Sequence, residues 1–127
     1  MVDGDFTKPA FSEHAAAKPL NTPMMEWFGK HYAPDKADPH FAVSQADLTG
    51  LPTTTIVNAE VDPLRDDGKL LADKLSAAGI DVKHRKFDGV THEFFGMGAV
   101  VDKANEAVDF AAGRLVASFE QARSRTV

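Results

Sequence analysis

Two different spacings of apolar residues divide the chain into strands and helices. Residues 53–59 are β-branched and almost continuously apolar, which predicts a buried strand. Residues 63–78 repeat apolar side chains every three to four positions and stop at Gly79, which predicts a helix. Residues 82–87 predict a second strand, and their basic side chains suit a sheet edge that discourages further pairing. These basic residues are Lys83, Arg85 and Lys86.

Two further helices are predicted outside this region. A Thr-Pro pair, typical of a helix start, is followed by Met and aromatic residues at helical spacing, which predicts a helix over residues 23–32. Residues 102–123 carry an apolar stripe and predict the last helix. Residues 1–21 show neither strand nor helix periodicity, so we expect an irregular N-terminal arm before a domain over residues 22–127.

The strand, helix and strand have the combined length of one βαβ unit, which makes the two strands parallel. The predicted fold class is therefore α/β, with flanking helices. Ligand sites in such sheets lie beyond the carboxyl ends of the strands. Asp62 follows the first strand and His92 follows the second. If the strands are neighbours, ~5 Å apart, these two residues lie on adjacent loops.

A histidine at this edge has the chemistry of a general base. A neutral imidazole works in this way only in the right tautomer, which a carboxylate bonded to its second nitrogen fixes. Asp62 has the position to do this for His92. The alternative is that Asp62 caps the helix beginning at Pro63 and that His92 is an ordinary loop histidine. The spacing alone favours that alternative, because Asp caps are common.

Composition limits the classes of function. With 127 residues, 43% of them hydrophobic, the chain is long enough for one compact domain and too short for two. Its net charge of -5 disfavours nucleic-acid binding, which needs clustered Lys and Arg. The chain has no Cys, no apolar run approaching the ~18 residues of a membrane span, and an acidic start unlike a signal peptide. We expect a soluble, cytoplasmic protein.

One group of residues invites a metal-binding interpretation. It consists of His31, Asp35, Asp38 and His40. Two prolines interrupt the group, so no helix presents two of its members as the i, i+4 pair of a metal site. We therefore expect a solvated loop with no metal, and the chain shows no cofactor motif.

Two motifs carry a resemblance to a known family. The run DPLRDDG at residues 62–68, followed by HEFFGM at residues 92–97, resembles the acid and histidine segments of the hormone-sensitive-lipase-like branch of the α/β-hydrolases. MMEWF at residues 24–28, Tyr32, and DLTGLP at residues 47–52 resemble the same family in the same order. The resemblance covers about residues 21–120.

This resemblance implies that the chain corresponds to the C-terminal portion of a serine esterase. Asp62 and His92 would then complete a Ser-Asp-His triad that hydrolyses carboxylic esters. The resemblance also implies a substrate-binding role for the apolar residues Leu64, Trp27, Phe94 and Phe95, for which an ordinary core position is the alternative. Glu93 departs from the family, whose members often carry Gly after the histidine.

A larger departure is the missing nucleophile segment. Members of the family place the serine on a Gly-x-Ser-x-Gly elbow and the oxyanion hole on a His-Gly-Gly-Gly type loop, both upstream of the acid. Neither motif occurs in this chain. No serine here has the glycine frame, so none is expected to be the nucleophile; the serines are Ser12, Ser44, Ser76, Ser118 and Ser124.

The missing segment has consequences for partners. Without a serine and an oxyanion hole, the chain alone should hydrolyse esters negligibly, and an ester would be its substrate only once the missing portion is supplied. Without upstream strands, residues 53–59 would leave an unpaired edge, which predicts a homo-oligomer formed through that edge. The alternative function is a non-catalytic module that oligomerises or docks on a partner, with Asp62 and His92 as relics.

Overall fold

The structure, a computed structural model, describes residues 2–32, residue 35 and residues 38–124. The chain divides into two compact units, Met1–His92 and Glu93–Val127. No helix in the described parts of the chain is long and apolar enough to cross a bilayer.

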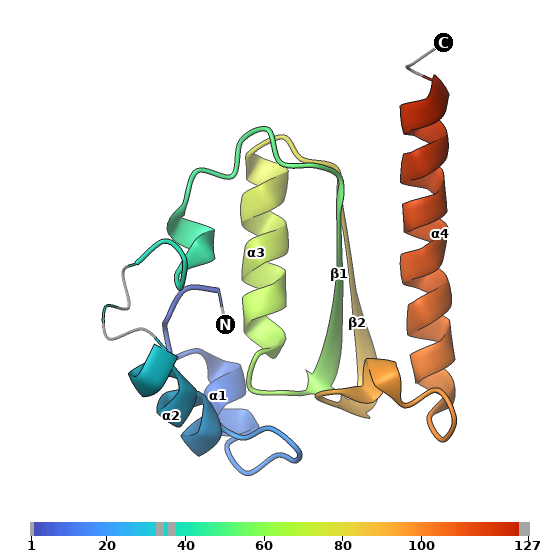
Figure 1. The fold of residues 1–127 in the computed structure, drawn as a ribbon. Helices are drawn as coiled ribbons and strands as arrows, with labels where there is room; N and C mark the ends of the chain where they lie inside the picture. Colours follow the sequence, from blue (N-terminus) through green and yellow to red (C-terminus); the bar gives the residue numbers. More distant parts are fainter. Residues whose placement is uncertain (1, 33–34, 36–37, 125–127) are drawn as a thin grey trace. The chain divides into compact units, whose positions relative to one another are not determined.

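The first unit is built on a parallel pair of strands. Strand β1 (Thr54–Val61) pairs with β2 (Val82–Thr91), and helix α3 (Arg65–Ala77) connects them. Helix α3 lies along both strands (Figure 1). It ends before Gly79, whose positive φ of 80° is a conformation that glycine adopts at least cost. The predicted α/β class and the parallel βαβ unit are confirmed.

A glycine allows α3 to approach β1 closely. A Cβ atom added to Gly68 would lie 1.7 Å from Oδ1 of Asn58 on β1, so any larger residue meets an occupied position. The same Asn58 oxygen lies 2.7 Å from Nε2 of His84 on β2. Burial lowers the pKa of His84, with a smaller contribution from the Lys69 charge. The Asn58 side chain therefore bonds to β2 and occupies the space that a side chain at position 68 of α3 would need.

The burial of β1 differs from the prediction. Its sequence predicts a buried strand, but only Ala59 of its eight residues is buried and the others are half-buried. The physical reason is that the described residues form a two-stranded sheet, so β1 has a strand neighbour on one edge only. An apolar strand of this kind is typical of the interior of a wider sheet.

Strand β2 extends four residues beyond its predicted end at Phe87. Ala59 pairs with Phe87 but Val61 pairs with Thr91, so one residue of β1 faces three residues of β2. Gly89 lies inside this irregularity with φ of 73°, and its N–H donates to the Glu60 carboxylate at 2.7 Å. The Asp-Gly pair, which signals a turn in the sequence, is absorbed as a bulge within the strand.

The N-terminal arm contains more structure than the sequence predicts. It includes α1 (Pro9–Glu13), and α2 (Thr22–Tyr32) follows where a helix is expected. A short 3-10 helix, η1 (Val43–Gln45), interrupts the predicted loop. Phe11, Leu20 and Met25 form a buried cluster, against which Phe6 and Leu64 pack. This cluster joins the arm to the start of α3.

The second unit contains the 3-10 helix η2 (Phe94–Gly96) and α4 (Asp102–Ser124), which contact each other. Glu93 precedes η2 with φ of 69°, a left-handed conformation that costs a non-glycine residue roughly 1–2 kcal/mol. Glycine adopts this conformation at least cost, which gives a physical reason for the Gly that the family resemblance leads us to expect here. In this chain Glu93 adopts it despite its side chain.

Candidate active site

Asp62 lies directly after β1, and its carboxylate bonds in two directions. Oδ1 accepts the backbone N–H of Leu64 at 2.8 Å, and Oδ2 lies 2.8 Å from Nδ1 of His92. Asp62 is buried, with only 4% of its surface exposed. It is not the cap of the following helix, because the N-cap of α3 is Leu64 and no side chain caps it.

His92 follows β2 and completes the pair. A carboxylate only accepts hydrogen bonds, so the Nδ1 of His92 carries the proton that bonds to Asp62. In the neutral imidazole the lone pair is then on Nε2, which is the tautomer that a general base requires. The His92 side chain is 31% exposed whereas that of Asp62 is 6% exposed, so the base is accessible and its orienting acid is enclosed.

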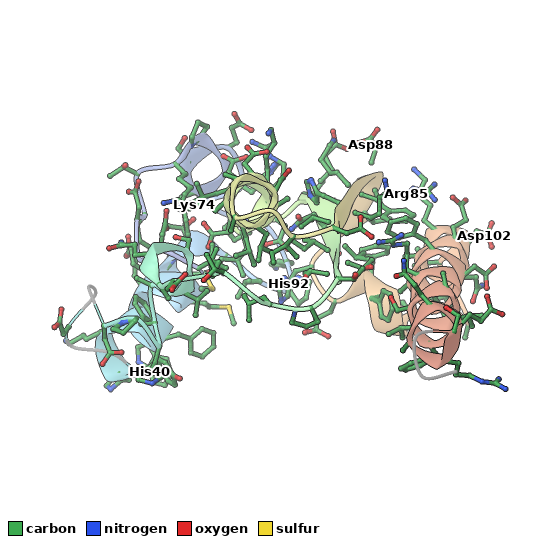
Figure 2. The ribbon with its side chains drawn as sticks, turned by 90° about the horizontal axis from the view of Figure 1, so that it is seen from above. His40, Lys74, Arg85, Asp88, His92 and Asp102 are labelled. Carbon is green, nitrogen blue, oxygen red and sulfur yellow. The ribbon has the colours of Figure 1, made fainter. Side chains whose placement is uncertain are left out.

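A second histidine–aspartate pair provides an internal comparison. Nδ1 of His40 lies 2.8 Å from Oδ1 of Asp38, the same separation as in the buried pair. These side chains are 90% and 48% exposed, so water screens their interaction. His40 lies at the periphery of the molecule, away from His92 (Figure 2). Distance alone does not distinguish the two pairs, and burial identifies Asp62 and His92 as the candidate site.

Two pairwise contacts involve residues that the sequence analysis considered for metal binding. Asp38 pairs with His40 two residues later, and the ring of His31 packs against that of Trp27 at 4.5 Å between centroids, with the ring planes tilted by 48°. Among the described residues, no three histidine or acidic side chains come together in a geometry that would hold a metal ion.

The four residues that the sequence suggests for substrate binding lie in different environments. Leu64 is two residues after the acid, and its side chain packs against the cluster that contains Phe11. Trp27 is 58% exposed on α2 and contacts the rings of Phe28 and His31. Phe94 and Phe95 belong to the second unit, where Phe94 is buried and Phe95 is 43% exposed.

Sequence reasoning missed two polar residues beside the site. Asp66 and Asp67, in the first turn of α3, accept hydrogen bonds from the backbone N–H groups of Ala10 and Val2. Acidic residues are common in the first turn of a helix, because they interact favourably with its dipole. Nothing in the local sequence therefore indicates that these carboxylates hold a segment more than fifty residues away.

Comparisons with known proteins identify the family of this chain. Residues 1–96 match the family described as alpha/beta hydrolase fold. The chain is 36% identical over 125 residues to carboxylesterase NlhH of Mycobacterium tuberculosis, and 30% identical over 113 residues to ethyl acetate hydrolase of Pseudomonas putida. Its structure is similar to that of EstE1, a thermostable carboxylesterase cloned from a metagenomic library, with a TM-score of 0.81 and 34% identity.

These similarities cover most of this chain and a minor part of each relative. The match to NlhH includes 93% of this chain and 38% of NlhH, and the match to ethyl acetate hydrolase includes 85% and 35%. For EstE1 the shares are 87% and 40%. The chain therefore spans well under half the length of these relatives. It belongs to the α/β-hydrolase fold family, and its relatives are hormone-sensitive-lipase-like carboxylesterases.

Proposed function

We propose that this chain supplies the general base and the orienting acid of a carboxylic ester hydrolase, with His92 as the base and Asp62 as the acid. The observation that carries the proposal is the 2.8 Å contact between Nδ1 of His92 and the buried Asp62 carboxylate. Membership of the α/β-hydrolase family and the ester-hydrolase names of the relatives support the same reaction class.

The chemistry follows from the tautomer. Nε2 of His92 accepts the proton of a serine hydroxyl while the serine oxygen attacks the ester carbonyl carbon. The imidazolium then gives this proton to the departing alkoxide, which leaves an acyl-enzyme and a free alcohol. Water hydrolyses the acyl-enzyme in the same way, with His92 again accepting and returning a proton. Throughout, the Asp62 carboxylate stabilises the imidazolium.

We propose further that the serine and the oxyanion hole come from sequence outside these 127 residues, because the chain has no Gly-x-Ser-x-Gly segment. An oxyanion donor alone contributes about 10²–10³ in rate. An acid–base pair without a nucleophile and without these donors should therefore turn over an ester negligibly.

The test uses a hybrid protein in which this chain replaces the matching segment of EstE1. We call this hybrid the chimera. We expect the isolated chain to hydrolyse p-nitrophenyl butyrate no faster than buffer, and the chimera to hydrolyse it well above buffer. The truncated EstE1 without its matching segment is the negative control. A folded chimera without activity would contradict the proposed function. Turnover by the isolated chain that is lost in His92→Ala would contradict its dependence on outside sequence.

A second candidate function, a homo-oligomerising module, is favoured by the free edge of β1. Within the described residues this edge has no strand neighbour, and Glu60 is the only charged residue on the strand. Strand β2 carries three basic residues and an acid, which discourage pairing at its own outer edge. We propose that a second copy of the chain pairs with β1. Two-fold symmetry would make this contact antiparallel.

A proline on the correct side of β1 tests this contact. The N–H of Thr54 donates to Asp81 O near the start of β2 at 2.9 Å, so by alternation the N–H of Thr55 points to the free edge. Thr55→Pro should convert a dimer of twice 13.7 kDa into a monomer in light scattering, without breaking the β1–β2 ladder. Thr55→Val, which keeps the N–H, should stay dimeric. A monomeric unmodified chain would exclude the contact.

A further inference from the structure

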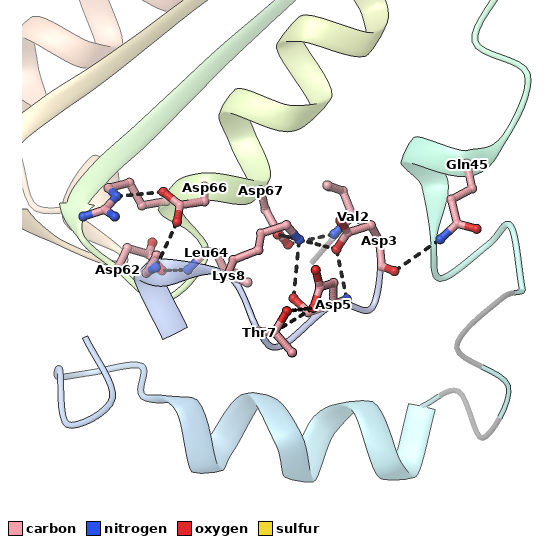
Figure 3. A network of polar contacts seen from close by, with 12 residues as sticks. Val2, Asp3, Asp5, Thr7, Lys8, Gln45, Asp62, Leu64, Asp66 and Asp67 are labelled. Carbon is pink, nitrogen blue, oxygen red and sulfur yellow. Dashed lines mark hydrogen bonds and ion pairs between the residues drawn. The ribbon is translucent and has the colours of Figure 1, made fainter. Parts of the chain in front are cut away.

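The N-terminal arm is bound to the turn that carries the candidate acid (Figure 3). After Asp62 and the fully buried Pro63, each of the next four residues contacts the arm. One of these contacts is apolar and three are polar. The residues are Leu64, Arg65, Asp66 and Asp67.

Asp67 is the most enclosed of the polar contacts, with 2% of its surface exposed. Its Oδ2 accepts the N–H of Val2 at 2.9 Å, and its Oδ1 accepts from Nζ of Lys8 at 2.7 Å. Lys8 also donates to Asp3. Burial would lower the pKa of Lys8, but the hydrogen bonds to Asp3 and Asp67 outweigh it and raise that pKa. Lys8 therefore stays charged, and its bonds to the carboxylates are charge-assisted.

Asp66 and Arg65 hold the next part of the arm. Oδ2 of Asp66 accepts the N–H of Ala10 at 2.9 Å, and Oδ1 accepts from Nε of Arg65 at 3.0 Å. Nη1 of Arg65 reaches Glu13 at 2.7 Å. Burial would raise the pKa of Asp66, but the hydrogen bonds from Arg65 and Ala10 outweigh it and lower that pKa. The pair thus links the start of α3 to both ends of α1.

These contacts reach the acid through the backbone. The N–H of Leu64 donates to the Asp62 carboxylate, and the N–H of Asp67 donates to the Leu64 carbonyl at 3.1 Å. The Leu64 side chain is held in the cluster around Phe11. The Asp62 carboxylate is therefore oriented by a turn whose next residues are fixed on the arm.

We propose that Asp66 and Asp67 are positioning residues, which hold the arm against the acid turn and thereby keep the Asp62 carboxylate aimed at Nδ1 of His92. This inference rests on the proposed function in one respect, namely that Asp62 orients the base. According to this proposal, residues 2–14 help to set the tautomer of His92, and they act through Asp66 and Asp67.

The experiment uses the ¹⁵N-labelled full chain and the double variant Asp66→Asn/Asp67→Asn. Asn keeps one acceptor oxygen but carries no charge, so each charge-assisted hydrogen bond is replaced at best by a neutral one, and the amide protons of Val2 and Ala10 should exchange with solvent about tenfold faster. If the arm positions the acid, the His92 ring nitrogens should also shift from the Nδ1–H tautomer toward a mixture of both tautomers. The ring signals report this directly, and the amide signals of Ile56 and Phe87 check that the sheet is intact.

The matched control is Asp73→Asn on the same helix, whose carboxylate bonds Lys69 at the surface and is 63% exposed. It should leave both readouts unchanged. If the arm amides exchange faster while the His92 tautomer stays fixed, or if neither changes, the positioning role is wrong. If the double variant does not fold, the single variant Asp67→Asn tests the positioning role with the same two measurements, amide exchange in the arm and the tautomer of His92. An inactive chimera would contradict the proposed function without changing these signals.

Discussion

Replacing Asp62 by Asn in the chimera is expected to lower kcat for a p-nitrophenyl ester by about 10⁴-fold, about 5.4 kcal/mol of transition-state stabilisation. The cause is the tautomer. An Asn that presents its NH₂ group to Nδ1 of His92 stabilises the form protonated on Nε2, which cannot accept the serine proton. Replacing His92 by Ala removes the base itself, so its loss should be larger, about 10⁶-fold. Both losses are measured at saturating ester.

The surface pair supplies the controls. Asp38→Asn and His40→Ala disrupt a histidine–aspartate contact of equal length, and the chimera should keep its kcat in both. Equal effects of the buried and the exposed substitutions would contradict the assignment. So would an Asp62→Asn chimera with unchanged kcat, because Asp62 would then only shape the turn before α3.

Replacing Gly68 by Ala is expected to destabilise the first unit, although Ala is the better helix former. The added Cβ would overlap Oδ1 of Asn58 at 1.7 Å, and overpacking of this kind costs about 1–3 kcal/mol. The helix propensity of Ala returns about 1 kcal/mol. We expect a net loss of up to about 2 kcal/mol in the free energy of unfolding, measured by urea denaturation.

A double-mutant cycle separates this overlap from other effects. Gly68→Ala should cost little stability when it is made in the Asn58→Ala background, because that background lacks the atom that the new Cβ meets. Gly113→Ala on α4 is the matched control, since a Cβ there meets no atom within 4 Å and should not destabilise. A Gly68→Ala chain as stable as the unmodified one would show that Asn58 moves aside freely.

The parts of the fold that depend on local spacing could be predicted from the sequence. The helix ending before Gly79, the two strands and their parallel order follow from periodicity and from the length of the connection. The burial of β1 could not be predicted. An apolar sequence is typical of a strand with neighbouring strands on both edges, but it does not show whether those neighbouring strands are present. The extension of β2 past Phe87 was missed because Asp-Gly indicates a turn and a bulge equally well.

The candidate site divides in the same way. The proximity of Asp62 and His92 follows from parallel strands that end at one edge, and the structure places them 2.8 Å apart. The contacts of the arm with Asp66 and Asp67 could not be predicted, because they join residues 56 and 65 positions apart and have no period. Charge alone offers many partners for two aspartates, and only the folded chain selects among them.

The irregularity in β2 limits how this region can change in length during evolution. Side chains alternate between the faces of a strand, so inserting or deleting one residue between Phe87 and His92 would turn the histidine to the opposite face. Deleting two residues from the bulge would instead leave a single residue of β2 opposite Glu60, so Thr91 would still pair with Val61 and His92 would stay beside Asp62. A change of one residue breaks the contact with Asp62, whereas loss of the two extra residues preserves it. Changes of length in this segment are therefore compatible with the pair only in steps of two residues.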